Sequence, residues 1–287
     1  MYLPKLVKFI PYVLLNLNDH LYYYKETIKK LLRFGNCKNI RGFEYKYGFL
    51  STKIKPLKMK AVITGATKGI GRAIAIKLCK KGYDLVLAAR NQKDLEVLRD
   101  ELLITGREIL IYAVDCAVKA DVYQFLNSVE KDFGFTDVLV NNVGTFLPGS
   151  LLDEEDKTFE QQQNLNVNAC YYISKYFGKK MRLAHRGHIF NICSVASKAP
   201  AKNGGSYSVT KAAMLSLNHV LRQELAPHNV KVTAFLPGST KTSSWEGTTI
   251  PDEKFVQPED IAETLYTILN LSKGVNVDEV LMTPLDF

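Results

Sequence analysis

The feature that most constrains the fold of this chain is a glycine-rich turn between an apolar run and an amphipathic segment. The apolar run 61–63 leads into Thr64-Gly65-Ala66-Thr67-Lys68-Gly69-Ile70-Gly71, and a helical pattern begins at once. The three glycines allow a tight turn and a close approach of the backbone to a pyrophosphate, and a helix N-terminus offers unpaired N–H groups to an anion. The spacing is GxxxGxG rather than GxGxxG, and glycine also serves ordinary turns. The strand–turn–helix context nevertheless favours a dinucleotide-binding loop.

Beyond Met59, short apolar runs alternate with helical patterns, which is typical of βαβ units and a parallel sheet. The continuous apolar run 85–89 indicates a strand covered on both faces. We predict strands near residues 60–64, 84–89, 109–114, 137–141, 187–193, 230–235 and 278–282. We predict helices near residues 69–81, 91–104, 118–132, 156–182, 206–226 and 258–271. The expected fold of residues 59–287 is therefore a single Rossmann-like α/β domain, a doubly wound parallel sheet of about seven strands with helices on both faces.

Residues 1–58 differ from the rest of the chain in composition. They hold 12 of the 38 Lys and Arg residues but 3 of the 29 Asp and Glu residues, so the whole formal charge of +9 lies there. We interpret them as a basic N-terminal extension that is poorly ordered or absent from the native protein. A basic tether to a membrane surface or a partner is the alternative. The remaining residues are formally neutral, which argues against nucleic-acid binding by the main domain.

The composition also bears on location and metal content. No apolar run is long enough for a membrane-spanning helix. The five cysteines and five histidines are dispersed, without a CxxC or HExxH pattern. We therefore expect a cytoplasmic protein without a dedicated metal site.

The end of the second predicted strand bears on cofactor choice. An NAD site favours an Asp or Glu there, where it binds the ribose 2′-hydroxyl. This chain has Arg90 instead, and the nearest acids are Asp84 at the other end of the strand and Asp94 within the next helix. The guanidinium of Arg90 suits a 2′-phosphate, and Lys68 in the glycine loop adds a second positive charge. These residues together predict NADP(H) as the cofactor, although either one alone would be an ordinary surface charge.

The pattern YxxxK occurs three times, at Tyr171/Lys175, Tyr176/Lys180 and Tyr207/Lys211. The i,i+4 spacing places both side chains on one helix face in every case, so the pattern alone does not select a copy. The third copy has a serine, Ser194, 13 residues before its tyrosine, directly after an apolar predicted strand. Ligands of open α/β sheets bind beyond the carboxyl ends of the strands. This context singles out the third copy.

From Met59 onward the chain resembles the short-chain dehydrogenase/reductase family, with its TGxxxGxG and YxxxK motifs. The resemblance extends to four further elements in the same order: Asp115 after the third predicted strand, Asn141-Asn142-Val143-Gly144 in place of NNAG, Asn168 as the helical asparagine, and Pro237-Gly238 with Thr242 as PGxxxT. It implies that Tyr207 is the general acid/base, Lys211 stabilises the phenolate and holds the nicotinamide ribose, Ser194 orients the substrate oxygen, and Asn168 holds a water on a proton path. It implies cofactor contacts from Gly65, Thr67, Lys68, Gly69, Ile70, Gly71, Arg90, Asp115, Asn142, Gly144, Lys211, Pro237, Gly238, Thr240 and Thr242.

Three of these residues have ordinary structural alternatives. Asn168 could cap or kink its helix, Asp115 could cap the next helix, and Thr242 could be a plain loop residue.

The resemblance further implies an NADP(H)-dependent oxidoreductase that interconverts a carbonyl and an alcohol, and an assembly into homodimers or homotetramers. The short segment 239–256 favours a compact, small to medium substrate. The segment Pro258-Glu259-Asp260-Ile261-Ala262 also resembles 3-oxoacyl-[acyl-carrier-protein] reductases, which remain an alternative although the C-terminal segment 280–287 differs from theirs. A non-catalytic NADP-binding regulator is the alternative from another class.

Overall fold

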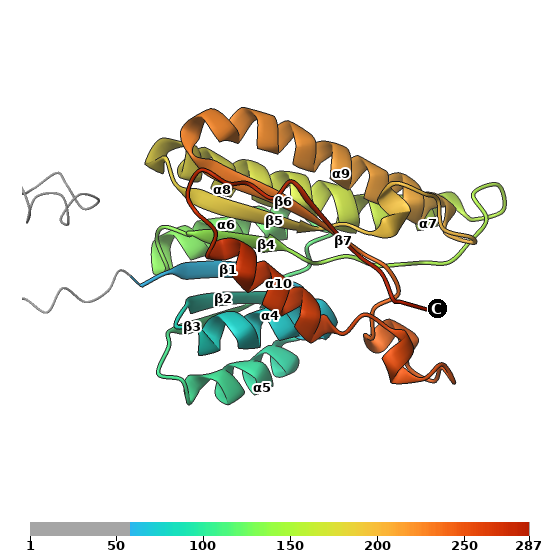
Figure 1. The fold of residues 1–287 in the computed structure, drawn as a ribbon, viewed down its shortest axis with the longest axis horizontal. Helices are drawn as coiled ribbons and strands as arrows, with labels where there is room; N and C mark the ends of the chain where they lie inside the picture. Colours follow the sequence, from blue (N-terminus) through green and yellow to red (C-terminus); the bar gives the residue numbers. More distant parts are fainter. Residues whose placement is uncertain (1–57, 287) are drawn as a thin grey trace, which may run out of the picture. The chain divides into compact units, whose positions relative to one another are not determined.

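The sheet is the framework of this protein, and the computed structural model describes it within residues 58–286. Predictions on residues 1–57 lie outside the described residues. Every neighbouring pair of strands is parallel, in the order β3-β2-β1-β4-β5-β6-β7 (Figure 1). The strands are β1 (Lys60–Thr64), β2 (Asp84–Ala89), β3 (Ile109–Ala113), β4 (Val138–Asn141), β5 (Gly187–Ile192), β6 (Val230–Pro237) and β7 (Glu279–Met282). This arrangement confirms the predicted fold class.

Helices cover both faces of the sheet because successive strand residues point to opposite sides. Ala61 and Ile63 of β1 pack with the apolar faces of α4, α5 and α10, whereas Val62 packs with those of α6, α8 and α9. The helices are α4 (Gly69–Lys80), α5 (Gln92–Leu103), α6 (Lys119–Asp132), α7 (Asp156–Gln162), α8 (Ala169–Ala184), α9 (Gly205–Leu225) and α10 (Pro258–Leu269). None of the helices in the described part is long and apolar enough to cross a membrane.

The sequence pattern predicted one continuous helix over residues 156–182, and this is wrong. A π-helical segment, η1 (Gln163–Asn168), separates α7 from α8. Short π-helical insertions widen a helix locally and are frequent at functional sites. The interruption reorients the side chains around Asn166, which matters for the site described below.

The strand order reverses between β1 and β4, because β1 continues outward to β2 and β3 whereas β4 continues to β5, β6 and β7. The loops that leave β1 and β4 at their carboxyl ends therefore diverge and open a crevice. The glycine loop 65–69 leaves β1 at this point, and Asn142-Val143-Gly144 leaves β4 beside it. The topology thus places these two sequence motifs together.

Candidate active site

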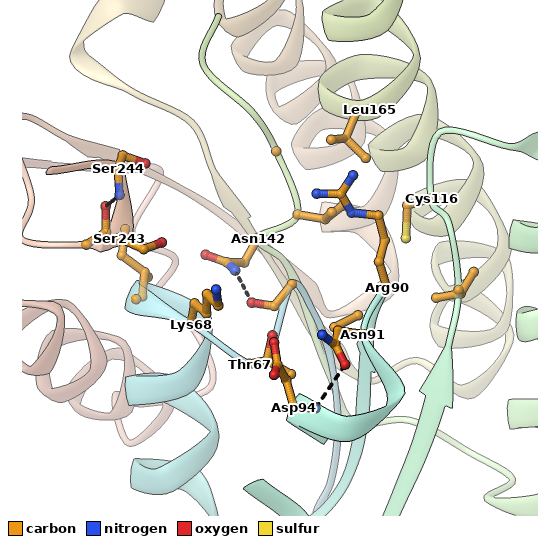
Figure 2. A pocket seen from close by; sticks show the side chains of 18 of the residues that line it. Thr67, Lys68, Arg90, Asn91, Asp94, Cys116, Asn142, Leu165, Ser243 and Ser244 are labelled. Atoms are coloured by element: carbon orange, nitrogen blue, oxygen red, sulfur yellow. Dashed lines mark hydrogen bonds between the residues drawn. The ribbon is translucent and has the colours of Figure 1, made fainter. Parts of the chain in front are cut away.

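A cavity of about 890 Å³ lies at this switch point, and its walls come from loops at the carboxyl ends of several strands (Figure 2). Nine of the residues predicted to contact a cofactor line it, namely Gly65, Thr67, Lys68, Gly69, Ile70, Arg90, Asn142, Gly144 and Thr242. The cavity also takes in Val114 and Cys116 after β3, and Ser243 and Ser244 after Thr242. Burial raises the pKa of Cys116 to about 12, so its thiol stays protonated near neutral pH.

Glycine is required in the loop for steric reasons that the structure makes explicit. Gly65 has a φ of +63°, and a Cβ there would lie 2.9 Å from Asn142 Nδ2. A Cβ on Gly71 would lie 2.2 Å from the Gly65 carbonyl oxygen. Asn142 Nδ2 donates to the carbonyl oxygens of Thr64 at 3.1 Å and Gly65 at 2.9 Å, so one side chain fixes the start of the loop. The result is a bare backbone surface next to the N-terminus of α4, which fits a pyrophosphate.

The charges that line the cavity are mainly positive. Lys68 and Arg90 are both exposed there, and Figure 2 shows their side chains around the same cavity as Asn142. One acid, Asp94, also lines the cavity. It lies at the start of α5, where the Asn91 side chain accepts hydrogen bonds from the backbone N–H groups of Lys93 and Asp94. Two cations against one carboxylate favour an anionic group in this part of the cavity.

Several predicted cofactor residues lie outside the cavity wall. Asp115 accepts a hydrogen bond from the Ala117 N–H at 3.0 Å, in the turn before α6, and does not cap that helix, whose N-cap residue is Val118. Gly238 pairs with β7 through its N–H and the Met282 carbonyl oxygen at 2.7 Å. Thr240 is buried and donates to the Gly238 carbonyl oxygen at 2.9 Å. Pro237 ends β6. These residues shape the connection that carries Thr242, whose methyl group packs against Gly69.

Ser194, Tyr207 and Lys211 lie at the carboxyl end of β5. Ser194 follows this strand, is 7% exposed, and accepts a hydrogen bond from the Ala196 N–H at 3.1 Å. Tyr207 belongs to the first turn of α9, and the short helix that follows Ser194 contacts α9. Lys211 is 5% exposed, and its Nζ donates to the Ile192 carbonyl oxygen at 2.9 Å. Within the described residues this is the one hydrogen bond of an ammonium with three donors, which leaves capacity for a ligand.

The helical asparagine next to Lys211 is Asn166 rather than the predicted Asn168. A Cβ on Gly144 would lie 3.0 Å from Asn166 Oδ1 and 3.6 Å from Lys211 Nζ, so both side chains flank this cavity residue. The Asn168 amide instead bonds to Gln163 and Asn164 within its own helical segment. The assignment of Asn168 to the site is therefore corrected to Asn166.

Asn166 is fully buried and makes three hydrogen bonds. Its Oδ1 accepts from the Thr145 N–H at 2.8 Å, and its Nδ2 donates to the Thr145 carbonyl oxygen at 3.1 Å and to Thr210 Oγ1 at 3.0 Å. Thr145 follows Gly144 and Thr210 precedes Lys211 in the chain. One amide therefore fixes the cavity wall relative to the helix that carries Lys211.

The other two YxxxK copies lie on the surface. Lys175 donates to the Tyr171 hydroxyl at 3.3 Å at an exposed site. The Tyr176 hydroxyl and the Lys180 ammonium both bond to Glu130. Burial and the bond to Glu130 raise the pKa of Tyr176, which keeps its hydroxyl protonated. Neither pair adjoins a strand end, in contrast to Tyr207 and Lys211.

The parallel fold, the glycine loop and the cavity at the switch point define a dinucleotide-binding α/β protein. A model of the short chain dehydrogenase family matches residues 59–251. An uncharacterized oxidoreductase of Staphylococcus epidermidis is 32% identical over 224 residues, which cover 78% of this chain and 96% of that protein. The chain belongs to the short-chain dehydrogenase family, and the predicted resemblance is confirmed.

Two solved structures extend the comparison to bound ligands. An alcohol dehydrogenase from the archaeon Thermococcus sibiricus, complexed with 5-hydroxy-NADP, is 30% identical with a TM-score of 0.74, and the match covers 79% of this chain and 97% of that one. L-Sorbose reductase from Gluconobacter frateurii, complexed with NADPH and L-sorbose, is 28% identical with a TM-score of 0.73, and the match covers 79% of this chain and 95% of that one.

Proposed function

We propose that this protein is an NADP(H)-dependent oxidoreductase that interconverts a carbonyl compound and an alcohol. The observation that carries the proposal is the position of Gly144, which lines the cavity and lies beside both Asn166 and Lys211. A nucleotide in the cavity would thus extend towards the helix that carries Tyr207. The NADP-type ligands of the two solved relatives support the cofactor, as do Lys68 and Arg90. When bound, NADPH supplies the hydride.

Each residue of the site has a role in proton transfer or positioning. Tyr207 donates its hydroxyl proton to the carbonyl oxygen during reduction and accepts it during oxidation. Lys211, whose ammonium lies 5.7 Å from the centre of the Tyr207 ring, stabilises the phenolate electrostatically. Ser194 donates to the substrate oxygen and orients it. Asn166 is a positioning residue, because its three hydrogen bonds hold the cavity wall against α9.

The proposed substrate is a small to medium carbonyl compound or alcohol. The two solved relatives are named as an alcohol dehydrogenase and an L-sorbose reductase, and both names refer to reactions of such groups. Neither relative gives specific support to the 3-oxoacyl-[acyl-carrier-protein] alternative. The presence of Ser194, Tyr207 and the buried Lys211 together favours an enzyme over a non-catalytic regulator, because nucleotide binding alone does not require a proton donor.

The proposal is tested by replacing the proton donor. Tyr207→Phe removes one oxygen and should lower kcat at least about a hundredfold for the reduction of aldehydes with NADPH, measured at 340 nm. NADPH affinity, measured by fluorescence titration, should change less than about threefold. Tyr171→Phe and Tyr176→Phe are matched controls that should keep nearly full kcat. Equal losses in all three variants would contradict the assignment.

We also propose a homodimer or homotetramer in the cytoplasm. A groove of about 270 Å³ between α8 and α9 has Leu217, Leu221 and Leu225 among its lining residues, which suits helix packing between subunits. The four cysteines within the described residues are free and buried, in keeping with a reducing compartment. Analytical ultracentrifugation of the full chain at micromolar concentration should give twice or four times the mass of one subunit.

A further inference from the structure

An exposed aromatic ring stands directly against Tyr207. The rings of Phe146 and Tyr207 meet edge to face, with centroids 4.9 Å apart and an interplanar angle of 81°. Phe146 is nevertheless 44% exposed. Part of its apolar surface therefore faces solvent next to the proposed proton donor. Aromatic side chains usually bury such surface, because the burial of their large apolar area stabilises the folded protein or a complex.

The loop that carries Phe146 is anchored to the N-terminus of α9 rather than loosely packed. The Gly149 N–H donates to the Asn203 carbonyl oxygen at 2.8 Å, and the Gly205 N–H donates to the Gly149 carbonyl oxygen at 3.2 Å. Further along, the buried Ser206 hydroxyl donates to the Glu154 carboxylate. These bonds tie the loop to both sides of the turn that precedes Tyr207. The position of Phe146 relative to Tyr207 is thus set by the backbone.

The close approach depends on two adjacent glycines. A Cβ on Gly204 would lie 3.3 Å from Phe146 Cε2, and a Cβ on Gly205 would lie 2.7 Å from Leu151 Cβ. Leu151 is 57% exposed on the same loop. A larger residue at 205 would overlap the Leu151 backbone and push the loop outward, and one at 204 would press on the Phe146 ring. The loop therefore presents two exposed apolar side chains near the start of α9, Phe146 against the Tyr207 ring and Leu151 against Gly205.

We infer that Phe146 and Leu151 form an apolar wall that selects carbonyl substrates with a hydrophobic arm, such as aliphatic aldehydes and ketones of medium chain length. The inference rests on the proposed function, because the Tyr207 hydroxyl must reach the carbonyl oxygen. A carbonyl held there has its substituents next to the Phe146 ring. Covering the exposed ring with an alkyl chain removes apolar surface of both partners from water.

The expected preference for longer substrates, expressed as a ratio of kcat/KM values, follows from the number of methylene groups that the wall covers. Octanal has four more methylenes than butanal, and their complete burial corresponds to about a 200-fold gain in kcat/KM. A wall that is open to solvent on one side covers roughly half of this surface, so we expect a gain of about tenfold. The gain should lie in KM rather than kcat, because the contact is the same in the ground state and the transition state.

The test compares chain-length series in three variants. With NADPH, the full-length enzyme should show the tenfold octanal/butanal ratio of kcat/KM, and Phe146→Ala should reduce this ratio below about threefold. Phe146→Leu keeps an apolar side chain and should restore most of the ratio. Leu183→Ala is the control, because Leu183 is 81% exposed at the end of α8, at the opposite edge of the sheet from the site. It should keep the wild-type ratio.

Calorimetric titration with butanamide and octanamide in the presence of NADP⁺ measures the same contact without chemistry. Octanamide should bind about tenfold more tightly than butanamide, with a more negative heat-capacity change, and Phe146→Ala should remove the difference. Reduction of aldehydes without any dependence on chain length would contradict the inferred apolar wall and leave the proposed function intact. Amide binding that depends on Phe146, without reduction of any aldehyde, would support the wall and contradict the proposed function.

Discussion

Two buried helical glycines should respond oppositely to the same substitution. Replacing glycine by alanine inside a helix ordinarily stabilises it by about 1 kcal/mol, because the unfolded chain loses freedom. At Gly178 of α8 an added Cβ would meet Leu225 at 3.5 Å and Ile189 at 3.8 Å, which are ordinary contacts. At Gly71 of α4 it would lie 2.2 Å from the Gly65 carbonyl oxygen and 2.5 Å from Asn142 Nδ2.

The overlap at Gly71 requires the loop to move by about 1 Å, and overpacking of this kind costs about 1–3 kcal/mol. Movement of Asn142 also weakens its hydrogen bonds to Thr64 and Gly65, at about 1 kcal/mol each. After subtraction of the helical gain, we expect Gly71→Ala to lower the free energy of unfolding by about 3 kcal/mol. For a domain of this size that corresponds to a decrease in Tm of about 6–12 °C.

Thermal unfolding followed by circular dichroism and NADPH titration by fluorescence together test this reasoning. Gly71→Ala should also weaken NADPH binding more than tenfold, since the displaced loop is the proposed phosphate site. Gly178→Ala should raise Tm by about 2–4 °C and leave NADPH affinity unchanged. The steric argument is refuted if Gly71→Ala melts within 2 °C of the unmodified protein, or if both variants shift in the same direction.

Three further predictions follow from the site and from the division of the chain. Arg90→Asp should weaken NADPH binding more than tenfold and improve kcat/KM with NADH, because the new carboxylate repels a 2′-phosphate and accepts from a 2′-hydroxyl. Asn166→Ala should lower stability by about 2 kcal/mol in urea unfolding and reduce kcat, because it leaves buried partners unpaired, whereas Asn168→Ala should change stability by less than about 0.5 kcal/mol. A protein of residues 59–287 should be soluble with full kcat/KM; insolubility or lost turnover would show that residues 1–58 are required.

The fold was predictable from the sequence because parallel strands covered on both faces have a distinctive composition. All six residues of β2 are buried, and the five that follow Asp84 form one apolar run in the sequence. The switch point then followed from the order of the motifs. The predicted ends of the strands were less accurate: β6 extends to Pro237, two residues beyond the predicted end, because its last residues pair with β7.

The helical asparagine shows where local patterns fail. Asn168 lies in one helical row with Tyr172, Tyr176 and Lys180, at i,i+4 spacing. Tyr176 and Lys180 of this row bond to Glu130 at the surface. Asn166 lies in the row with Cys170, Ser174 and Gly178, which are all buried. This row of small and polar side chains was a usable signal for the inner face. The π-helical turn was not predictable, because it accompanies bonds to Thr145 and Thr210, residues distant in the sequence.

Two adjacent asparagines, Asn141 at the end of β4 and Asn142 directly after it, connect the glycine loop to β5. Asn142 binds the carbonyl oxygen of Gly65, whereas the buried Asn141 donates to Asn191 Oδ1 of β5 at 2.8 Å. Asn191 lies three residues before Ser194, so two neighbouring side chains link the glycine loop on one side to the strand that leads to Ser194 on the other. Neither bond is visible in a motif. Because the buried Asn141 and Asn191 amides would be left unpaired by a displacement, this link restrains the spacing between the glycine loop and Ser194.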